Sequence, residues 1–243
     1  MLEKVRIVLV DTSHPGNIGA AARAMKNMCL QHLYLVTPHQ FPNAEATSRA
    51  SGADDLLARA VVCDSLDEAL AGCSLVIGAS ARMRNLTLPL LDPRQCAAQV
   101  LQDSPHSEVA IMFGREHSGL TNEELSRCHY LMHIASNEAF SSLNIAAAVQ
   151  VVAYELKMAH DAALAVAPTE EGDSEPPVPA DEMERFYTHL QDTLVEIGFL
   201  DPDNPRMMMR RLRRLYNRAR PNHVEMNILR GILTATQTPR PRR

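Results

Sequence analysis

The sequence predicts an α/β domain with a mostly parallel sheet, followed by a small α-helical extension. Two observations carry this prediction. Short apolar runs alternate with helical segments through about residue 160, which is the pattern of repeated βαβ units. After a proline-rich acidic stretch, the composition then changes to an arginine-rich helical tail. No run of 18 apolar residues occurs, so the sequence predicts no transmembrane helix.

The expected strands are short runs of β-branched and other apolar residues, as in strands buried on both faces. They are residues 7–10, 32–36, 60–63, 75–78, 109–113 and 130–134. Ligands of parallel sheets bind beyond the carboxyl ends of the strands. We therefore expect the loops that follow four of these strands to converge on one site: 11–17, 78–82, 114–119 and 134–143.

The expected helices lie between these strands and begin at capping residues. They cover residues 18–28, 44–52, 66–71, 92–102, 122–128 and 145–158. Asn17 is the predicted N-cap of the first, and Thr121 with Glu124 forms a predicted capping box. Ser141 or Ser142 is the predicted cap of the last helix, which is rich in alanine and valine.

The C-terminal part differs in charge from the rest of the chain. Residues 165–181 form a proline-rich acidic linker. Helices are expected at 182–197, 205–218 and 223–236. From residue 205 onward there are eleven arginines, no lysine and one acid, Glu225, whereas the whole chain carries a formal charge of −5. Such a tail suggests an anionic partner, the alternative being a solvated basic helix. We divide the chain into domains at 1–164 and 182–243, joined by the linker.

Cysteine and histidine patterns argue against a metal site and a secreted protein. The five cysteines are scattered without a CxxC pair, so we interpret them as reduced thiols. His14, His117 and His133 lack zinc-ligand spacing. The N-terminus reads as a first strand and lacks a signal-peptide pattern. We therefore expect a cytoplasmic protein that binds no metal and no membrane.

Three segments carry a specific resemblance. They are NIGAAAR (17–23), GREHSGL (114–120) and HIASNEAFSSLNIAAAVQ (133–150), in this order. Together they resemble the three motifs of the SPOUT superfamily of RNA methyltransferases, within its TrmH-like 2′-O-ribose branch and nearest to the bacterial TrmJ-like tRNA methyltransferases. The resemblance covers nearly the whole chain and implies a C-terminal trefoil knot in the sheet domain. The spacing Gly16-x-x-Gly19 lacks the NAD fingerprint of a Rossmann fold.

The resemblance implies S-adenosylmethionine as cofactor, held mainly by backbone groups in an apolar slot. Gly114, which ends a strand, permits close backbone approach. The positions that match the family's cofactor site are Ala79, Ser80, Ala81, Gly114, Ile134, Ser141, Ser142 and Leu143.

Four residues are candidates for catalysis. Arg23 can grip a phosphate next to the target ribose with its planar guanidinium. Asn17 is expected to fix its loop or touch the ribose, and Ser142 to orient the hydroxyl or the cofactor carboxylate. Glu116 is expected to pair with Arg23 or Arg115; a plain salt-bridge role and direct catalysis are equally open.

The RNA-binding candidates are arginines in the loops and the tail, which suit a phosphate backbone. They are Arg82, Arg84, Arg115, Arg210, Arg211, Arg213, Arg214 and Arg218. Residues 85–87 read Asn-Leu-Thr where close relatives have a Pro-Trp-Pro-like segment, which removes an aromatic stacking group.

We therefore expect an enzyme that methylates the 2′-hydroxyl of cytidine or uridine at position 32 of the tRNA anticodon loop. Two alternatives remain: a 2′-O-methyltransferase acting on ribosomal RNA, and a non-catalytic RNA-binding module. The resemblance also implies a homodimer that pairs through the first and last helices of the sheet domain, where small residues such as Ala20, Ala24, Ala146 and Ala148 permit close packing.

Overall fold

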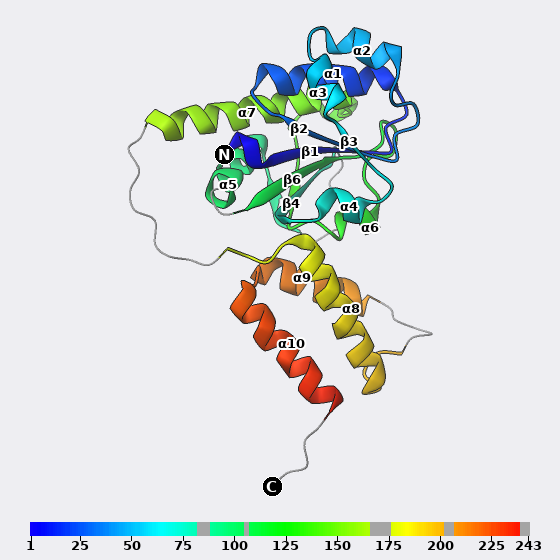
Figure 1. Ribbon diagram of the computed structural model, residues 1–243, viewed down its shortest axis with the longest axis vertical. Coiled ribbons are helices and arrows are strands. Elements are labelled where there is room, and N and C mark those ends of the chain that lie inside the picture. The colour runs from blue at the N-terminus through cyan, green and yellow to red at the C-terminus, as the bar shows by residue number, and fades with distance from the viewer. Residues whose placement is uncertain (82–87, 105–106, 166–175, 202–206, 239–243) are drawn as a thin grey trace.

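The computed structural model describes residues 1–81, 88–104, 107–165, 176–201 and 207–238. Its body is a parallel sheet in the order β3-β2-β1-β6-β4-β7-β5 (Figure 1). The strands are β1 Val5–Val10, β2 His32–Val36, β3 Val61–Cys63, β4 Cys73–Ala79, β5 Leu90–Leu91, β6 Glu108–Phe113 and β7 Tyr130–Met132. The predicted fold class and the six predicted strands are confirmed; the short edge strand β5 had no sequence signal. The trefoil knot stays a prediction from the resemblance.

One face of the sheet carries the larger core. Side chains of β1, β4 and β6, such as Ile7, Ile77 and Ile111, pack there against five helices. These helices are α1 Pro15–Asn27, α2 Ala44–Ala50, α3 Asp54–Ala58, α5 Pro93–Asp103 and α7 Ile145–Ala165. Figure 1 shows α1, α2, α3 and α7 on the same side of the sheet. The close approach of α1 to α2 requires Gly19, where an added Cβ would lie 2.0 Å from the carbonyl oxygen of Ala46.

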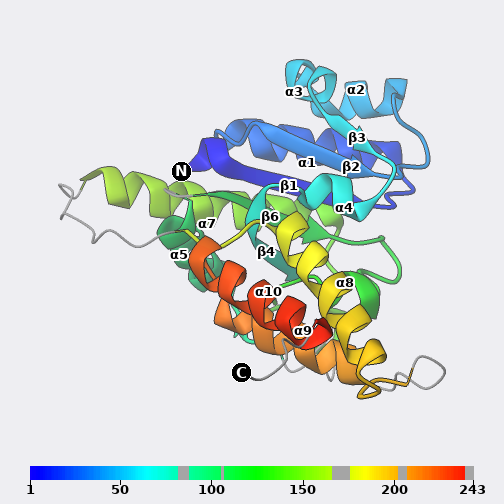
Figure 2. The same cartoon turned by 60° about the horizontal axis from the view of Figure 1, so that its bottom comes forward.

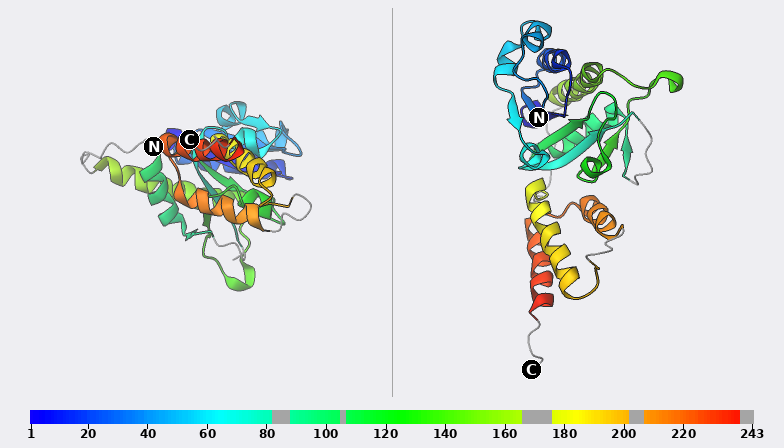
Figure 3. Two further views of the ribbon diagram at one scale, coloured as in Figure 1. Left: turned by 90° about the horizontal axis from the view of Figure 1, so that it is seen from below. Right: turned by 90° about the vertical axis from the view of Figure 1, so that its right-hand side faces the viewer.

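On the opposite face of the sheet, the body contributes a smaller core and only short helices. Val8, Val76 and Met112 point into a second core with the short helices α4 Leu66–Leu70 and α6 Asn122–Leu125. Ala180, at the start of the C-terminal unit, packs against the same core. The C-terminal helices therefore lie on the side of the sheet away from α1 and α7 (Figures 1 and 3).

The C-terminal unit consists of three helices around a core of its own. They are α8 Ala180–Glu196, α9 Met208–Ala219 and α10 His223–Gln237. Phe186 and Tyr187 are almost fully buried between them, and Met226 of α10 is fully buried. Figure 2 shows the three helices side by side beneath the sheet. All three predicted helices are present, each within three residues of its predicted bounds.

Several helix ends differ from the sequence prediction. His14, not Asn17, caps α1: its Nδ1 accepts a hydrogen bond from the amide of Gly16 at 3.2 Å. The proline at position 15 lets the helix begin earlier than Asn17. The predicted capping box of Thr121 and Glu124 is confirmed. Short 3₁₀ helices at Leu2–Lys4 and Glu138–Phe140 were not predicted.

Neither Ser141 nor Ser142 caps α7. Asn144 takes this role, because its Oδ1 accepts from the amide of Ala146 at 2.9 Å. The helix also runs about two turns beyond the predicted end at residue 158, to Ala165. In the part of the chain that the structure describes, no helix is long and apolar enough to cross a membrane.

Candidate active site

A pocket of about 340 Å³ opens at the carboxyl ends of β4, β6 and β7. This is the edge where the sequence predicted that four loops converge, and three of them line it. All eight residues predicted to hold the cofactor lie in its wall. The remaining wall residues are Phe113, Arg115, Glu116, His117, Ser118, Gly119, Met132, Asn144, Ile145 and Ala148. The sequence argument missed Asn144 as a site residue, although an asparagine directly before a helical run is itself a capping signal.

Glu116 is the main acceptor at the mouth of this pocket. Its Oε2 accepts from the amide and hydroxyl of Ser13 at 3.2 and 3.1 Å, and its Oε1 accepts from the amide of His14 at 3.2 Å. Asn17 Nδ2 also donates to Oε1, at 2.9 Å. Burial raises the pKa of Glu116, but the hydrogen bonds from Asn17 and from the amides of Glu116, Ser13 and His14 outweigh it and lower the pKa to about 2. The side chain is therefore a fixed carboxylate.

The predicted partners of Glu116 were wrong. It pairs with neither Arg23 nor Arg115. Arg115 instead donates to Asp11 Oδ2 at 2.5 Å and to both carboxylate oxygens of Glu124 at 3.0 to 3.1 Å. These bonds close the loop after β6 onto the loop after β1 and onto α6. Because Arg115 already has two carboxylate partners, an RNA phosphate would have to compete with both of them for it.

Asn17 and Asn144 extend the contact from Glu116 to α7. Asn17 donates to Glu116, and its Oδ1 accepts from Asn144 Nδ2 at 2.9 Å. Asn144 in turn caps α7 through the amide of Ala146. The three segments that carry the sequence resemblance are thus connected by consecutive side-chain hydrogen bonds, from Glu116 to Asn17 and from Asn17 to Asn144. The expected role of Asn17 in fixing its loop agrees with this geometry.

Gly114 lines the pocket, but the reason for a glycine differs from the one predicted. A Cβ at this position would lie 2.2 Å from the carbonyl carbon of Gly119 and 2.2 Å from the amide nitrogen of Leu120. The space beside Gly114 is thus filled by its own loop, which folds back through a bridge between Arg115 and Gly119. A glycine at position 114 therefore allows residues 114–119, the loop after β6 (here called the cofactor loop), to fold back on itself.

Arg23 lies on the exposed side of α1 and outside the wall of the pocket in the same chain. Within the described ranges it makes no hydrogen bond or ion pair, so its guanidinium is available to a ligand. Ser142 is exposed and lies in the pocket wall. The structure therefore brings Asn17, Glu116 and Ser142 to one loop cluster, whereas Arg23 lies on the exposed side of α1 and not in the pocket wall.

The walls of the pocket suit an adenosine-type cofactor. Small residues such as Ala79, Ala81 and Ala148 leave backbone atoms accessible, and Phe113, Met132 and Ile134 supply apolar surface for a base. Asn144 and the hydroxyls of Ser141 and Ser142 supply polar groups for a ribose or an amino-acid tail. The volume lies within the range of small-molecule sites, about 300 to 1,000 Å³. The predicted residues thus fit S-adenosylmethionine.

Apart from Arg115, whose ion pairs are described above, the predicted RNA-binding arginines divide into three groups. Arg82 and Arg84 lie outside the described residues, as does the segment 85–87. In α9, four of the predicted arginines are exposed: Arg210, Arg211, Arg214 and Arg218. Arg213 is instead half-buried against Glu184 and Tyr187. Its prediction as an RNA contact was drawn from charge alone, which does not distinguish the two faces of a helix.

Comparison with known proteins gives two family matches that together cover most of the chain. Residues 4–154 match the SpoU rRNA Methylase family, and residues 181–243 match the C-terminal domain of the tRNA methyltransferase TrmJ. The chain is 56% identical to the tRNA (cytidine/uridine/adenosine-2′-O-)-methyltransferase TrmJ of Pseudomonas aeruginosa, covering 98% of this chain and 95% of that protein. It is 51% identical to the tRNA (cytidine/uridine-2′-O-)-methyltransferase TrmJ of Cronobacter sakazakii, covering 99% and 98%. The crystal structure of TrmJ from Z. mobilis superposes with a TM-score of 0.84 at 35% identity, covering 96% and 99%.

Proposed function

The chain belongs to the SpoU methylase family and to its TrmJ branch, and we propose on this basis that it is an S-adenosylmethionine-dependent tRNA 2′-O-ribose methyltransferase. The observation that carries the proposal is the pocket at the carboxyl edge of the sheet, whose walls contain every residue predicted to hold the cofactor. A tRNA substrate also accounts for the arginine-rich helix α9. The enzyme accordingly acts in the cytoplasm.

The cofactor supplies an electrophilic methyl group, and the protein supplies position. Gly114 and Gly119 close the loop after β6, and Ala79, Ser80 and Ala81 line the pocket at the end of the neighbouring strand β4. Ser142 is exposed in the wall and is placed to orient the ribose hydroxyl or the cofactor carboxylate. Glu116 acts by holding Asn17 and the loop after β1. A carboxylate with a pKa of about 2 is too weak a base to take a proton from a hydroxyl near neutral pH.

Arg23 is the proposed catalytic cation. Its exposed, planar guanidinium has no partner among the described residues and can hold a phosphate next to the target ribose through two parallel hydrogen bonds. Since Arg23 is absent from the pocket wall of its own chain, we propose that it serves the pocket of a second subunit across a two-fold axis.

We propose that the dimer surface lies on α1 and α7, as predicted, but that other residues than the predicted alanines form it. Ala24 and Ala146 are buried within one chain, because α1 packs on α7, so they cannot also meet a partner. An exposed apolar stripe remains on α7 at Val151, Tyr154 and Met158, spaced three and four residues apart. This stripe is the surface proposed to pair with the second subunit.

The proposed target is the 2′-hydroxyl of cytidine or uridine at position 32 of the tRNA anticodon loop. The printed activities of the Pseudomonas and Cronobacter relatives share cytidine and uridine. We propose the sheet domain through Ala165 as the methyltransferase domain and the helices from Ala180 onward as the tRNA-binding domain. The predicted linker 165–181 is shortened at both ends, because α7 includes Ala165 and α8 begins at Ala180. The exposed arginines of α9 are its proposed phosphate contacts.

The test is nucleoside mass spectrometry of unmodified tRNA and ribosomal RNA after incubation with the protein and cofactor. The tRNA transcripts carry cytidine, uridine or adenosine at position 32. We expect 2′-O-methylcytidine and 2′-O-methyluridine at position 32 of tRNA. Methylation confined to ribosomal RNA would favour the ribosomal alternative. Cofactor binding without transfer to either RNA would favour a non-catalytic RNA-binding module.

A further inference from the structure

The two faces of α9 have different surroundings. Arg210, Arg211, Arg214 and Arg218 are exposed on one face. On the other, Arg213 is partly buried and Asn217 retains only 5% of its exposed area. Arg220, the residue after the helix, is also largely buried. The arginine-rich helix thus presents one cationic face to solvent and uses the other to dock.

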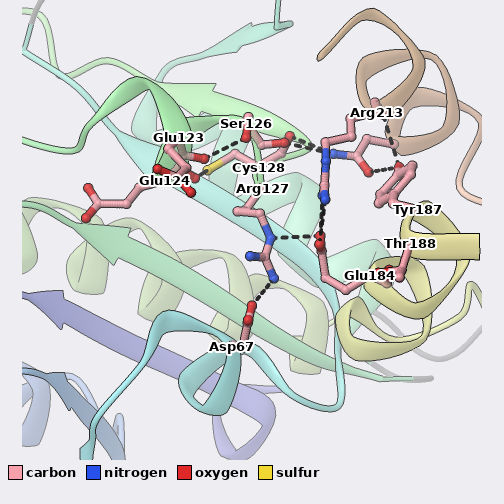
Figure 4. Close-up of polar contacts among 11 residues, drawn as sticks. Asp67, Glu123, Glu124, Ser126, Arg127, Cys128, Glu184, Tyr187, Thr188 and Arg213 are labelled. Atoms are coloured by element: carbon pink, nitrogen blue, oxygen red, sulfur yellow. Dashed lines mark hydrogen bonds and ion pairs between the residues drawn. The ribbon is translucent and has the colours of Figure 1, made fainter. Parts of the chain in front are cut away.

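Glu184 of α8 forms the first docking contact. It accepts a bidentate pair from Arg213, at 2.5 and 2.8 Å, and a further bond from Arg127 Nε at 2.8 Å (Figure 4). Arg127 belongs to the turn between α6 and β7 and also pairs with Asp67 of α4. The Arg213 guanidinium additionally stacks over the ring of Tyr187, with its carbon 4.4 Å from the ring centroid. One carboxylate thus joins α8, α9 and the body.

Asn217 and Arg220 form a second and a third contact. Asn217 Nδ2 donates to the carbonyl oxygens of Ser126 and Cys128, both at 3.4 Å, while its Oδ1 accepts from Tyr187 Oη at 2.6 Å. Arg220 makes a bidentate pair with Asp103 at the end of α5, and Asp103 is only 8% exposed. These contacts lie on segments that precede β6 and β7, at the edge of the sheet opposite the pocket.

Such contacts fix an orientation better than apolar packing does. Bidentate arginine–carboxylate pairs have a narrow geometry. Removing one partner of a largely buried pair leaves an uncompensated charge, so partial displacement is costly. The turn that contacts Glu184 and Asn217 also supports the pocket, because Glu124, just before this turn, holds Arg115 in the loop after β6. The same segment therefore positions both the arginine face and the cofactor loop.

We propose, on the basis of the function proposed above, that Glu184 and Asp103 are positioning residues for methyl transfer. By clamping α9 onto the body they fix the distance and direction between RNA phosphates on the exposed arginine face and the cofactor pocket. The C-terminal helices then hold the bound RNA at a fixed position relative to the pocket.

The test compares clamp variants with surface variants in the full-length protein. The clamp variants are Asp103→Asn and Glu184→Ala; the matched surface variant is Arg211→Ala combined with Arg214→Ala. Filter binding gives the tRNA Kd, calorimetry gives the Kd for S-adenosylmethionine alone, and methyl transfer at saturating tRNA gives kcat. The clamp variants should lower kcat about tenfold or more with the tRNA Kd within about twofold, because misplacement by about 1 Å costs as much as a hundredfold. The surface variant should show the opposite split, with its larger effect on the tRNA Kd and its smaller effect on kcat.

Two further measurements separate positioning from damage. The double variant Asp103→Asn, Arg220→Gln should be no worse than either single variant, since the pair acts as a unit. Small-angle scattering should show a larger radius of gyration for the clamp variants with unchanged cofactor affinity. If the clamp variants raise the tRNA Kd without lowering kcat, or change neither, the proposal is overturned. If the wild-type protein transfers no methyl group but the variants still expand, the proposed function fails and the docking itself stands.

Discussion

Asn17 and Glu116 are 99 residues apart in the chain, yet Asn17 Nδ2 donates a hydrogen bond to Glu116 Oε1 at 2.9 Å. Asn144 donates to the same Asn17 side chain at 2.9 Å. The start of α1, the loop after β6 and the start of α7 are therefore tied to each other by side chains. Loss of any one of the three should loosen the site without removing a strand from the core.

Replacing Glu116 with glutamine should change how stability depends on pH. The pKa of Glu116 lies below its ordinary value of 4.5, at about 2. A carboxyl group with a depressed folded-state pKa adds stability above its unfolded pKa and loses it as pH falls through the folded value. The wild-type unfolding free energy should thus fall more steeply than that of Glu116→Gln between about pH 4.5 and pH 2. Denaturant melts at several pH values measure both slopes, and parallel slopes would contradict the assignment.

Replacing Gly114 with alanine should abolish cofactor binding through displacement of the loop. The new Cβ would meet the backbone of Gly119 and Leu120 at 2.2 Å, too close for either to remain in place. Gly119→Ala is the matched control in the same loop. It meets open space and is opposed only by a positive φ of 68°, a cost of about 1 to 2 kcal/mol. Calorimetric cofactor affinities should therefore rank wild type, Gly119→Ala and Gly114→Ala in that order; equal affinities for the two variants would refute the role of the close contact.

Arg23→Ala should leave cofactor affinity near that of the wild type and remove methyl transfer. The reason is that Arg23 lies outside the pocket wall of its own chain and is free of protein partners among the described residues. Arg23→Lys should rescue poorly, because lysine offers a point charge and lacks the two-pronged grip. Single-turnover transfer to tRNA distinguishes the variants. Activity of the lysine variant close to wild type would show that charge alone suffices.

A negative charge on the apolar stripe of α7 should separate the subunits. Tyr154 and Met158 are 49% and 45% exposed, so glutamate at either position should not disturb the core of one chain. Leu164→Glu, at a 73% exposed position near the end of the same helix and off the stripe, is the control. Light scattering at micromolar concentration should give a dimer for the wild type and the control, and a monomer for Tyr154→Glu. A monomeric wild-type protein would exclude the proposed arrangement.

Binding of tRNA should weaken steeply with salt, and the slope should depend on α9. Replacing Arg210, Arg211, Arg214 and Arg218 with alanine should make the plot of log affinity against log salt shallower by about 0.7 to 0.9 per lost phosphate contact. Deletion of residues 165–243 should remove most of the slope and keep cofactor binding. Filter binding across a salt series provides the slopes. A truncated protein that binds and methylates tRNA like the full chain would show that the tail is a solvated appendage.

Local sequence signals predicted the strands and most helices, because each buried strand is a short apolar run between turn residues. The rule that loops after parallel strands meet at one edge predicted where the pocket lies, and three of the four predicted loops line it. The eight wall residues named from the sequence came from the family resemblance. The true caps of α1 and α7 were missed for a physical reason. Several polar residues precede each helix, and which one caps depends on tertiary partners: Asn17 is occupied by Glu116 and Asn144.

Pairings between distant charges were not predictable from the sequence. Arg115 has acidic residues on several loops within possible reach, and only the fold selects Asp11 and Glu124. Likewise, the number of arginines in the tail predicted its positive charge, but it did not predict which arginines face the body and which face solvent. Arg213 and Arg214 are neighbours in sequence, yet one is held by Glu184 and the other faces solvent.

The most direct test of the central claim compares methyl transfer to two tRNA transcripts that differ only in the 2′-hydroxyl oxygen of the nucleotide at position 32. A transcript with cytidine at position 32 and a matched transcript with 2′-deoxycytidine there are each incubated with the protein and cofactor carrying a labelled methyl group. We predict stoichiometric labelling of the first transcript, no labelling of the second, and no labelling of either by Arg23→Ala. Equal labelling of both transcripts would show that the methyl group goes elsewhere and would contradict the assignment of this protein as a 2′-O-ribose methyltransferase acting at that position.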